Sequence, residues 1–272
     1  MTELQEQQIQ RYARHIVLQE VGGVGQSALL DAKVLVVGAG GLGSPLLMYL
    51  AAAGVGTIGV VDDDIVSLSN LQRQVAHGTP DIGRPKVESA KDRAAALNPD
   101  VNLVPHQMRL NPDNVMDLLA DYDIIADGSD NFDTRFLLND ACFLAKKTLV
   151  SAAVLRFDGQ LSTYKAYLGP PNPCYRCIFP EPPPPDSIPS CSQGGVLGAM
   201  AGVMGTMQAT EVIKEILGIG ASLSGRLVIH DALAGEFRTV RVKPDPNCAL
   251  CGDNPSIVDL RQASQGFAGT ET

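Results

Sequence analysis

Residues 34–46, VLVVGAGGLGSPL, constrain the fold more than any other stretch of the sequence. Four apolar residues typical of a buried strand lead into Gly38, Gly40 and Gly43, which match the pattern G-x-G-x-x-G, and the residues after them are predicted to be helical. A strand, a glycine turn and a helix in this order often hold a phosphate-bearing ligand at the helix N-terminus. The motif predicts a phosphate site without specifying the ligand.

Short apolar segments alternate with helical segments from residue 33 to residue 154. The predicted strands are 33–37, 57–64, 101–105, 123–127 and 149–154, and the predicted helices are 44–53, 83–98, 113–120 and 134–146. This alternation predicts an α/β fold with a Rossmann-like, mostly parallel sheet that carries helices on both faces.

The remaining segments are predicted to extend this sheet within one domain, residues 1–252. Residues 1–30 are expected to form an N-terminal helical arm. Beyond residue 155 we expect antiparallel strands at 160–167, 226–233 and 236–243 and a long apolar helix at 197–217. The proline-rich segment 181–195 is predicted to be a mobile crossing loop, and residues 253–272 a polar tail.

Composition excludes some classes of partner. The net charge of −9 argues against a nucleic-acid partner, which would need a basic surface. No apolar run reaches the length of a membrane span, so no membrane partner is expected. The polar N-terminus does not resemble a secretion signal, and a cytoplasmic location is therefore predicted.

Charged residues follow the predicted strands at the ends where α/β proteins bind ligands. Asp62 lies about 20 residues after Gly43, a spacing at which an acid can bind ribose hydroxyls. Arg73 and Lys86 together suit a polyphosphate, although either alone could be a solvated surface charge. Asp130, in the segment DGSDN, could bind Mg²⁺ beside phosphate oxygens, cap the next helix, or do both.

Four of the six cysteines form two C-x-x-C pairs, Cys174 with Cys177 and Cys248 with Cys251. Two pairs beside turn-forming residues predict a Cys₄ zinc site, which would be structural because four protein ligands leave no open position. A redox-active dithiol is the competing interpretation. Cys142, inside an apolar helix, is predicted to be an inert core thiol.

The ordered set of motifs resembles the MoeB/ThiF family, which belongs to the superfamily of ubiquitin-activating enzymes. The resemblance rests on GAGGLGS, the acid at 62, NLQRQ, GRPK, DGSDN, the paired cysteines and GVMGTMQATEVIK, and spans about residues 11–252. It implies ATP-dependent adenylation of the C-terminal Gly-Gly carboxylate of a small ubiquitin-like sulfur carrier of the MoaD/ThiS type. The products would be an acyl adenylate, which precedes the thiocarboxylate, and pyrophosphate. The implied cofactors are ATP with Mg²⁺ and a structural Zn²⁺.

The resemblance also implies roles for individual residues. Arg73, Lys86 and Asp130 would be catalytic, and Arg14 would reach the nucleotide of the other subunit, so that a homodimer is required for activity. Cys191 is a candidate for a covalent link to the carrier or to a sulfur donor. The residues expected to bind ATP and Mg²⁺ are Gly38, Gly40, Gly41, Gly43, Asp62, Ser69, Asn70, Leu71, Gln72, Arg73, Lys86, Gly128, Ser129, Asp130 and Asn131.

Some members of the family continue into a rhodanese domain, whereas this sequence stops at Thr272. A separate sulfur donor, a desulfurase or a rhodanese, is therefore expected. Molybdopterin synthesis, thiamine synthesis, cysteine synthesis and tRNA thiolation remain open as pathways. Two other functions also remain open: an NAD-dependent oxidoreductase that uses the glycine loop, and a non-catalytic module that binds the carrier.

Overall fold

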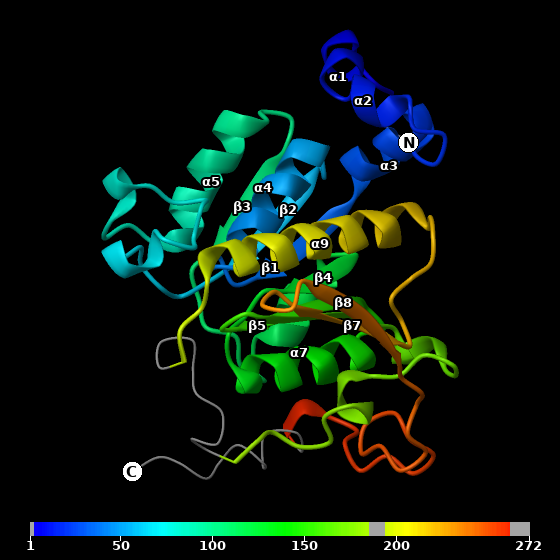
Figure 1. Cartoon of the computed structure of the whole chain (residues 1–272). Helices are drawn as coiled ribbons and strands as arrows, with labels where there is room; N and C mark the ends of the chain where they lie inside the picture. Colours follow the sequence, from blue (N-terminus) through cyan, green and yellow to red (C-terminus); the bar gives the residue numbers. More distant parts are fainter. Residues whose placement is uncertain (1–2, 185–193, 262–272) are drawn as a thin grey trace.

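The central feature of the computed structural model, which describes residues 3–184 and 194–261, is an eight-stranded sheet with helices on both faces (Figure 1). The strand order is β3-β2-β1-β4-β5-β6-β7-β8. The parallel strands are β1 (Lys33–Val37), β2 (Thr57–Val61), β3 (Asn102–His106), β4 (Ile124–Asp127) and β5 (Thr148–Leu155). Antiparallel pairing then adds β6 (Asp158–Tyr164), β7 (Arg226–Asp231) and β8 (Glu236–Arg241). The predicted fold class is confirmed.

Strand β1 lies between β2 and β4, so the chain reverses its direction of winding at β1. Val37 pairs with Val61 on one side and with Asp127 on the other, which places the carboxyl ends of three strands at the same level. The loops that follow these strands are therefore neighbours. Ligands of open α/β sheets bind at such a switch point.

Two apolar cores lie on opposite faces of the sheet. The helices on one face are α3 (Gly22–Asp31), α4 (Gly43–Ala53), α5 (Lys86–Leu97) and α9 (Gly198–Leu217), and those on the other are α6 (Val115–Ala120) and α7 (Phe132–Leu144). Along β1, Val34 and Val36 belong to the first core and Leu35 to the second. Successive strand residues point to opposite faces, so this apolar run is buried on both sides.

The predicted arm consists of two short helices, α1 (Glu6–Arg11) and α2 (Ala13–Ile16), which extend away from the sheet before α3 (Figure 1). Tyr12, between them, is buried. Its hydroxyl accepts a hydrogen bond of 2.8 Å from Asn98 Nδ2, which also donates to the carbonyl of Ala51 at 2.7 Å. This network fixes the arm to the C-terminal end of α4.

Most predicted elements agree with the structure to within a few residues. Helix α5 begins at Lys86 rather than at residue 83, because Gly83 has a φ of 88° and Pro85 precedes the first turn. The short 3₁₀ helices are η1 (Leu68–Asn70), η2 (Thr79–Asp81), η3 (Ala166–Leu168) and η4 (Tyr175–Cys177). Of the predicted crossing loop, residues 181–184, 194 and 195 are described; residue 194 is helical and the others belong to neither a helix nor a strand. No helix in the described part of the chain is both long and apolar enough to cross a membrane.

Candidate functional site

A cleft of about 2070 Å³ opens at the carboxyl ends of β1, β2 and β4. Eleven of the predicted ligand-binding residues line it: Gly38, Gly40, Gly41, Asp62, Asn70, Arg73, Lys86, Gly128, Ser129, Asp130 and Asn131. Gly43, Ser69, Leu71 and Gln72 are not among the lining residues. Cys191 lies outside the described residues, so its predicted role stays a prediction.

The glycine loop is packed tightly against the loop that follows β4. Gly38 has a φ of 94°, a conformation that favours glycine, and a Cβ there would lie 2.8 Å from the carbonyl oxygen of Gly128. A Cβ on Gly43 would lie 1.8 Å from the carbonyl oxygen of Gly38. Gly43 therefore allows the close approach of the backbone within the loop but does not line the cleft. Gly38, Gly40 and Gly41 do line the cleft, at the start of α4.

Asp62 ties the second strand to the glycine loop. Its Oδ2 accepts a hydrogen bond of 2.7 Å from the backbone N–H of Ala39, and its Oδ1 accepts one from the N–H of Asp64. The Lys86 ammonium group is 3.9 Å from Asp62 and 2.6 Å from Asp64, and the Lys86 residue is only 5% exposed. Burial raises the pKa of Asp62, and the charge of Lys86 opposes that rise. The site thus holds a buried cation with its counter-charges at the cleft wall.

Arg73 lies over the glycine loop. Its Nη1 donates to the carbonyl of Ser69 at 3.0 Å, and a Cβ at Gly41 would lie 3.5 Å from its Cγ and Cδ. The neighbouring Gln74 was not predicted as a site residue. It lines the cleft, is 3% exposed, and its Oε1 has no hydrogen-bond partner among the described residues. A buried amide without a partner is costly unless a ligand or water satisfies it, so Gln74 is a further candidate contact.

His77 supports the same loop from beneath. Its Nε2 lies 2.9 Å from the carbonyl oxygen of Ala39 and its Nδ1 lies 2.9 Å from Ser89 Oγ. Since the carbonyl can only accept, Nε2 carries the proton and Nδ1 accepts from the serine hydroxyl. Burial lowers the pKa of His77, so the fold favours the neutral ring.

Replacing His77 with glutamine should weaken the pH dependence of stability. The folded-state pKa is below the unfolded value of about 6.5, so the unfolded chain binds more protons just below that pH. The wild-type free energy of unfolding should therefore fall as the pH decreases from about 7.5 through 6.5, and the free energy of unfolding of the variant should fall less. Urea titrations from pH 5 to pH 8 measure this slope. Burial also lowers the pKa of His106, so part of this pH dependence should remain in the variant. A variant with the same slope as wild type would contradict the prediction.

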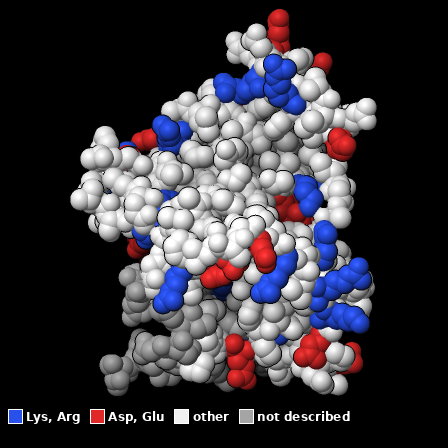
Figure 2. All heavy atoms as spheres, in the orientation of Figure 1, with Lys and Arg blue, Asp and Glu red and all other residues white. Residues whose placement is uncertain are grey.

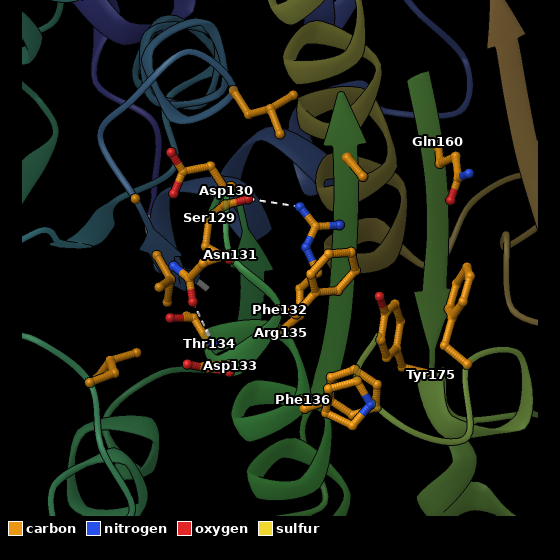
Figure 3. A pocket seen from close by; sticks show the side chains of 18 of the residues that line it. Ser129, Asp130, Asn131, Phe132, Asp133, Thr134, Arg135, Phe136, Gln160 and Tyr175 are labelled. Carbon is orange, nitrogen blue, oxygen red and sulfur yellow. Dashed lines mark hydrogen bonds between the residues drawn. The ribbon is translucent and has the colours of Figure 1, made fainter. Parts of the chain in front are cut away.

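The loop after β4 carries Asp130 on a rigid base. Buried Asp127 accepts hydrogen bonds from Ser129 N and Oγ on one oxygen and from Ser151 Oγ on the other. Asp130 itself is exposed at the cleft. Its alternative role as helix cap is wrong, because Asn131 is the N-cap of α7 and its side chain accepts from the N–H of Thr134 at 2.8 Å (Figure 3).

Arg14 does not line the cleft of its own chain. Two nearby residues are anchored, Tyr12 through Asn98 and His15 through a 3.0 Å hydrogen bond to Gln26 Oε1. Arg14 is exposed, and within the described part of the chain it forms no hydrogen bond or ion pair. The arm thus presents a free guanidinium group at a fixed place on the surface.

The four paired cysteines meet in space. Cys174 Sγ lies 3.9 Å from Cys177 Sγ, 3.5 Å from Cys248 Sγ and 3.4 Å from Cys251 Sγ. A tetrahedral ion with metal–sulfur distances of about 2.3 Å would hold its ligands about 3.8 Å apart. The cluster could therefore hold a metal ion, and it joins two segments that are distant in the sequence. Cys142 is buried, and burial raises the pKa of its thiol, as expected for an inert core residue.

Arg135, like Gln74, lines the cleft and is a candidate ligand contact that the sequence did not predict. It lies in the first turns of α7, is 9% exposed and lines the cleft. Its Nη2 donates to the carbonyl of Ser129 at 2.8 Å (Figure 3). A positive charge near a helix N-terminus is unfavourable, so an arginine near the start of this helix is a sequence signal that can indicate a functional residue.

Comparison with known proteins agrees with this architecture. A family model described as the ThiF family matches residues 12–250. The chain is 52% identical, over 98% of its length, to the adenylyltransferase and sulfurtransferase MOCS3 of Bos taurus, of which it spans 58%. It is 47% identical to the sulfur carrier protein adenylyltransferase of Thermus thermophilus (93% of this chain, 94% of that protein). It is 49% identical to the SAMP-activating enzyme E1 of Haloferax volcanii (93% of each).

Solved structures show the same fold. The crystal structure of E. coli MccB superposes with a TM-score of 0.75 at 23% identity and covers 90% of this chain and 73% of that one. The predicted resemblance to the MoeB/ThiF family is confirmed by the family match and by the relatives. This chain belongs to the ThiF family.

Proposed function

We propose that this chain uses ATP and Mg²⁺ to adenylate the C-terminal carboxylate of a small ubiquitin-like sulfur carrier that ends in Gly-Gly. The observation that carries the proposal is the convergence of Arg73, Lys86 and Asp130, from three segments of the chain, on one cleft beside the glycine loop. The names of the adenylyltransferase relatives support this reaction class over an NAD-dependent oxidoreductase. Two cations at the loop also suit a triphosphate that loses pyrophosphate.

The reaction needs alignment and charge neutralisation more than acid–base catalysis. A terminal carboxylate is ionised at neutral pH and can attack the α-phosphorus directly. A carboxylate–phosphorus bond forms, the bond from the α-phosphorus to the bridging oxygen breaks, and pyrophosphate leaves with the electron pair. Arg73 and Lys86 are placed to stabilise the charge on that leaving group. Mg²⁺, when bound by Asp130 and phosphate oxygens, would supply further charge neutralisation.

The size of the cleft supports two ligands. Sites for drug-sized molecules usually have volumes of about 300–1,000 Å³, whereas this cleft has about 2070 Å³. Its second half is lined by the β5–β6 hairpin and by residues 178–184. An extended peptide tail can lie there while the nucleotide occupies the glycine loop.

An exchange assay tests the function. The chain should incorporate labelled pyrophosphate into ATP in the presence of a small protein ending in Gly-Gly, and not when the last glycine of that protein is deleted. Candidate carriers can be isolated on the immobilised chain and assayed one by one. Tight NAD binding together with no exchange for any carrier would favour the oxidoreductase instead. Carrier binding without exchange would favour the non-catalytic module.

We further propose that the active form is a homodimer in which Arg14 serves the neighbouring subunit. The uncharged surface over α9 supports this, since few Lys, Arg, Asp or Glu side chains lie there (Figure 2). Val203 of α9 and Tyr49 of the adjacent α4 are exposed apolar residues, and the arm with Arg14 packs against the end of α4. Exposed apolar surface of this kind is typical of an interface.

Mixing two inactive variants tests the role of Arg14. Arg14→Ala and Arg73→Ala homodimers should each lose most activity. In a mixed dimer, the Arg14→Ala subunit keeps an intact cleft and receives Arg14 from its partner, so one site is complete. With free exchange of subunits, the mixture should recover about a quarter of wild-type exchange activity. No recovery in mixtures shown to contain mixed dimers would mean that Arg14 acts within its own subunit or not at all.

We propose that the cysteine cluster binds Zn²⁺, because four thiolates so close together suit a structural zinc site. A separate sulfur donor and a cytoplasmic location remain predictions from the sequence, as does the pathway that the carrier serves.

A further inference from the structure

Two buried arginines near the cleft differ in their partners. Arg176 is 6% exposed, and its Nε and Nη2 donate to the two carboxylate oxygens of Asp140 at 2.8 Å and 2.7 Å. Arg135 is 9% exposed, yet within residues 3–184 and 194–261 no carboxylate forms an ion pair with it. Buried charges are nearly always paired, so Arg135 is an exception that needs an explanation.

The surroundings of Arg135 increase the local positive potential. The residue lies near the N-terminus of α7, where the helix dipole also disfavours a cation. Two buried acids lie near Arg135 along the chain, and both have other partners: Asp127 is hydrogen-bonded to serines on both oxygens, and Asp140 is paired with Arg176. Of the five N–H groups of the guanidinium, one donates to the carbonyl of Ser129 and another lies within reach of the Tyr175 hydroxyl. The other three have no hydrogen-bond partner among the described residues and remain for a ligand in the cleft.

We infer that Arg135 binds the terminal carboxylate of the polypeptide that enters the cleft, an assignment that rests on the proposed adenylation. A planar guanidinium matches a carboxylate through two parallel hydrogen bonds, and the pair is strong where water is excluded. Binding the carboxylate would neutralise the buried cation and fix the nucleophile beside Asp130. Arg135 is thus a substrate-binding residue that orients the attacking group.

The position of Arg135 favours a peptide carboxylate over a phosphate of the nucleotide. Figure 3 shows it between the Ser129–Asp130 segment on one side and Tyr175 on the other, with Gln160 of β6 beyond. The cleft wall next to it is aromatic: Tyr175 packs edge-on against Phe136, with 5.1 Å between ring centroids, and in a tilted arrangement against Phe179, with 4.9 Å between centroids. A ligand that lies along this aromatic wall carries an organic chain on its anionic group, as the terminal carboxylate of a peptide does. Arg73 and Lys86, the cations proposed to bind the phosphates, lie instead beside the glycine loop.

A pair of peptides tests the assignment. A fluorescein-labelled hexapeptide ending in Gly-Gly is titrated onto the chain as the free acid and as the C-terminal amide, and the affinity for a non-hydrolysable ATP analogue is measured separately by calorimetry. Hydrogen bonds to charged groups contribute about 1.5–3 kcal/mol, so wild type should prefer the acid by about ten- to hundredfold. Arg135→Gln should reduce this preference to about onefold and change the affinity for the ATP analogue by less than about twofold.

Arg93→Gln is the matched control, because Arg93 lies exposed on α5 and its loss changes the net charge by the same amount. It should leave both measurements unchanged. If Arg135→Gln does not fold, Arg135→Lys keeps the charge without the planar fork and should reduce the acid preference several-fold. The assignment is overturned if the folded variants keep the wild-type preference for the acid over the amide peptide, or if they lose only affinity for the ATP analogue. In either case, carrier-dependent exchange by wild type would still support the proposed adenylation. Absence of both exchange and peptide binding in wild type overturns the two together.

Discussion

Replacing Asp130 with asparagine should lower carrier-dependent pyrophosphate exchange by at least about a hundredfold and leave the free energy of unfolding within about 0.5 kcal/mol of wild type. Asp130 is exposed at the cleft, and within the described part of the chain it forms no hydrogen bond or ion pair that the fold would lose. Its contribution should therefore appear only with the ligand. Asparagine keeps the shape but removes the charge that a divalent cation needs.

Asp133 is the matched control for this prediction. It is also exposed and also lines the cleft, but it lies in the first turn of α7. Asp133→Asn should lose about 0.3–1 kcal/mol of stability through the helix dipole and keep its exchange activity. The two variants together separate stability from catalysis. If Asp130→Asn retained exchange at saturating Mg²⁺, or if both variants lost it equally, Asp130 would not be the metal ligand.

The fold could be predicted from the sequence because its signals are local. The parallel strands β1 to β4 are short, mostly apolar runs that each lead to a helical segment, and such runs are buried on both faces wherever helices cover the sheet. The rule that ligands bind at the carboxyl ends of these strands then brought together Asp62, Arg73, Lys86 and Asp130. The pairing of Val37 with Val61 and Asp127 gives that rule its geometry.

The parts that could not be predicted depend on tertiary contacts. Arg135 and Gln74 stand out because both are buried and, among the described residues, Arg135 has no ion-pair partner and Gln74 Oε1 has no hydrogen-bond donor; neither property can be read from adjacent residues. His77 is a support for the glycine loop only because α5 brings Ser89 to its other nitrogen. Which of Asp130 and Asn131 caps α7 depends on where the first helical turn begins, a boundary that sequence patterns locate only to within a few residues.

Removal of the proposed zinc ion from the cysteine cluster should cause the largest loss of stability in this chain. Structural zinc contributes about 10–16 kcal/mol of apparent binding free energy in zinc-finger peptides at neutral pH, and much of it is available only to the folded site. Cys174 directly precedes η4 and Cys177 is its last residue, while Cys248 and Cys251 belong to a distant segment, so a shared zinc ion would join the two; among the described residues no disulfide does so. A strong chelator, or Cys177→Ser, should lower the melting temperature by more than about 10 °C.

The loss should extend to activity, because η4 begins with Tyr175, which forms the aromatic wall of the cleft. Elemental analysis should give one zinc per chain in wild type and much less in Cys177→Ser. Cys142→Ala is the control: this thiol is buried in α7 and is not one of the four clustered cysteines, so its removal should cost about 1 kcal/mol through lost packing and leave the zinc content unchanged. A metal-free preparation with wild-type melting temperature, whose thiols form two disulfides reversibly, would instead support the redox dithiol.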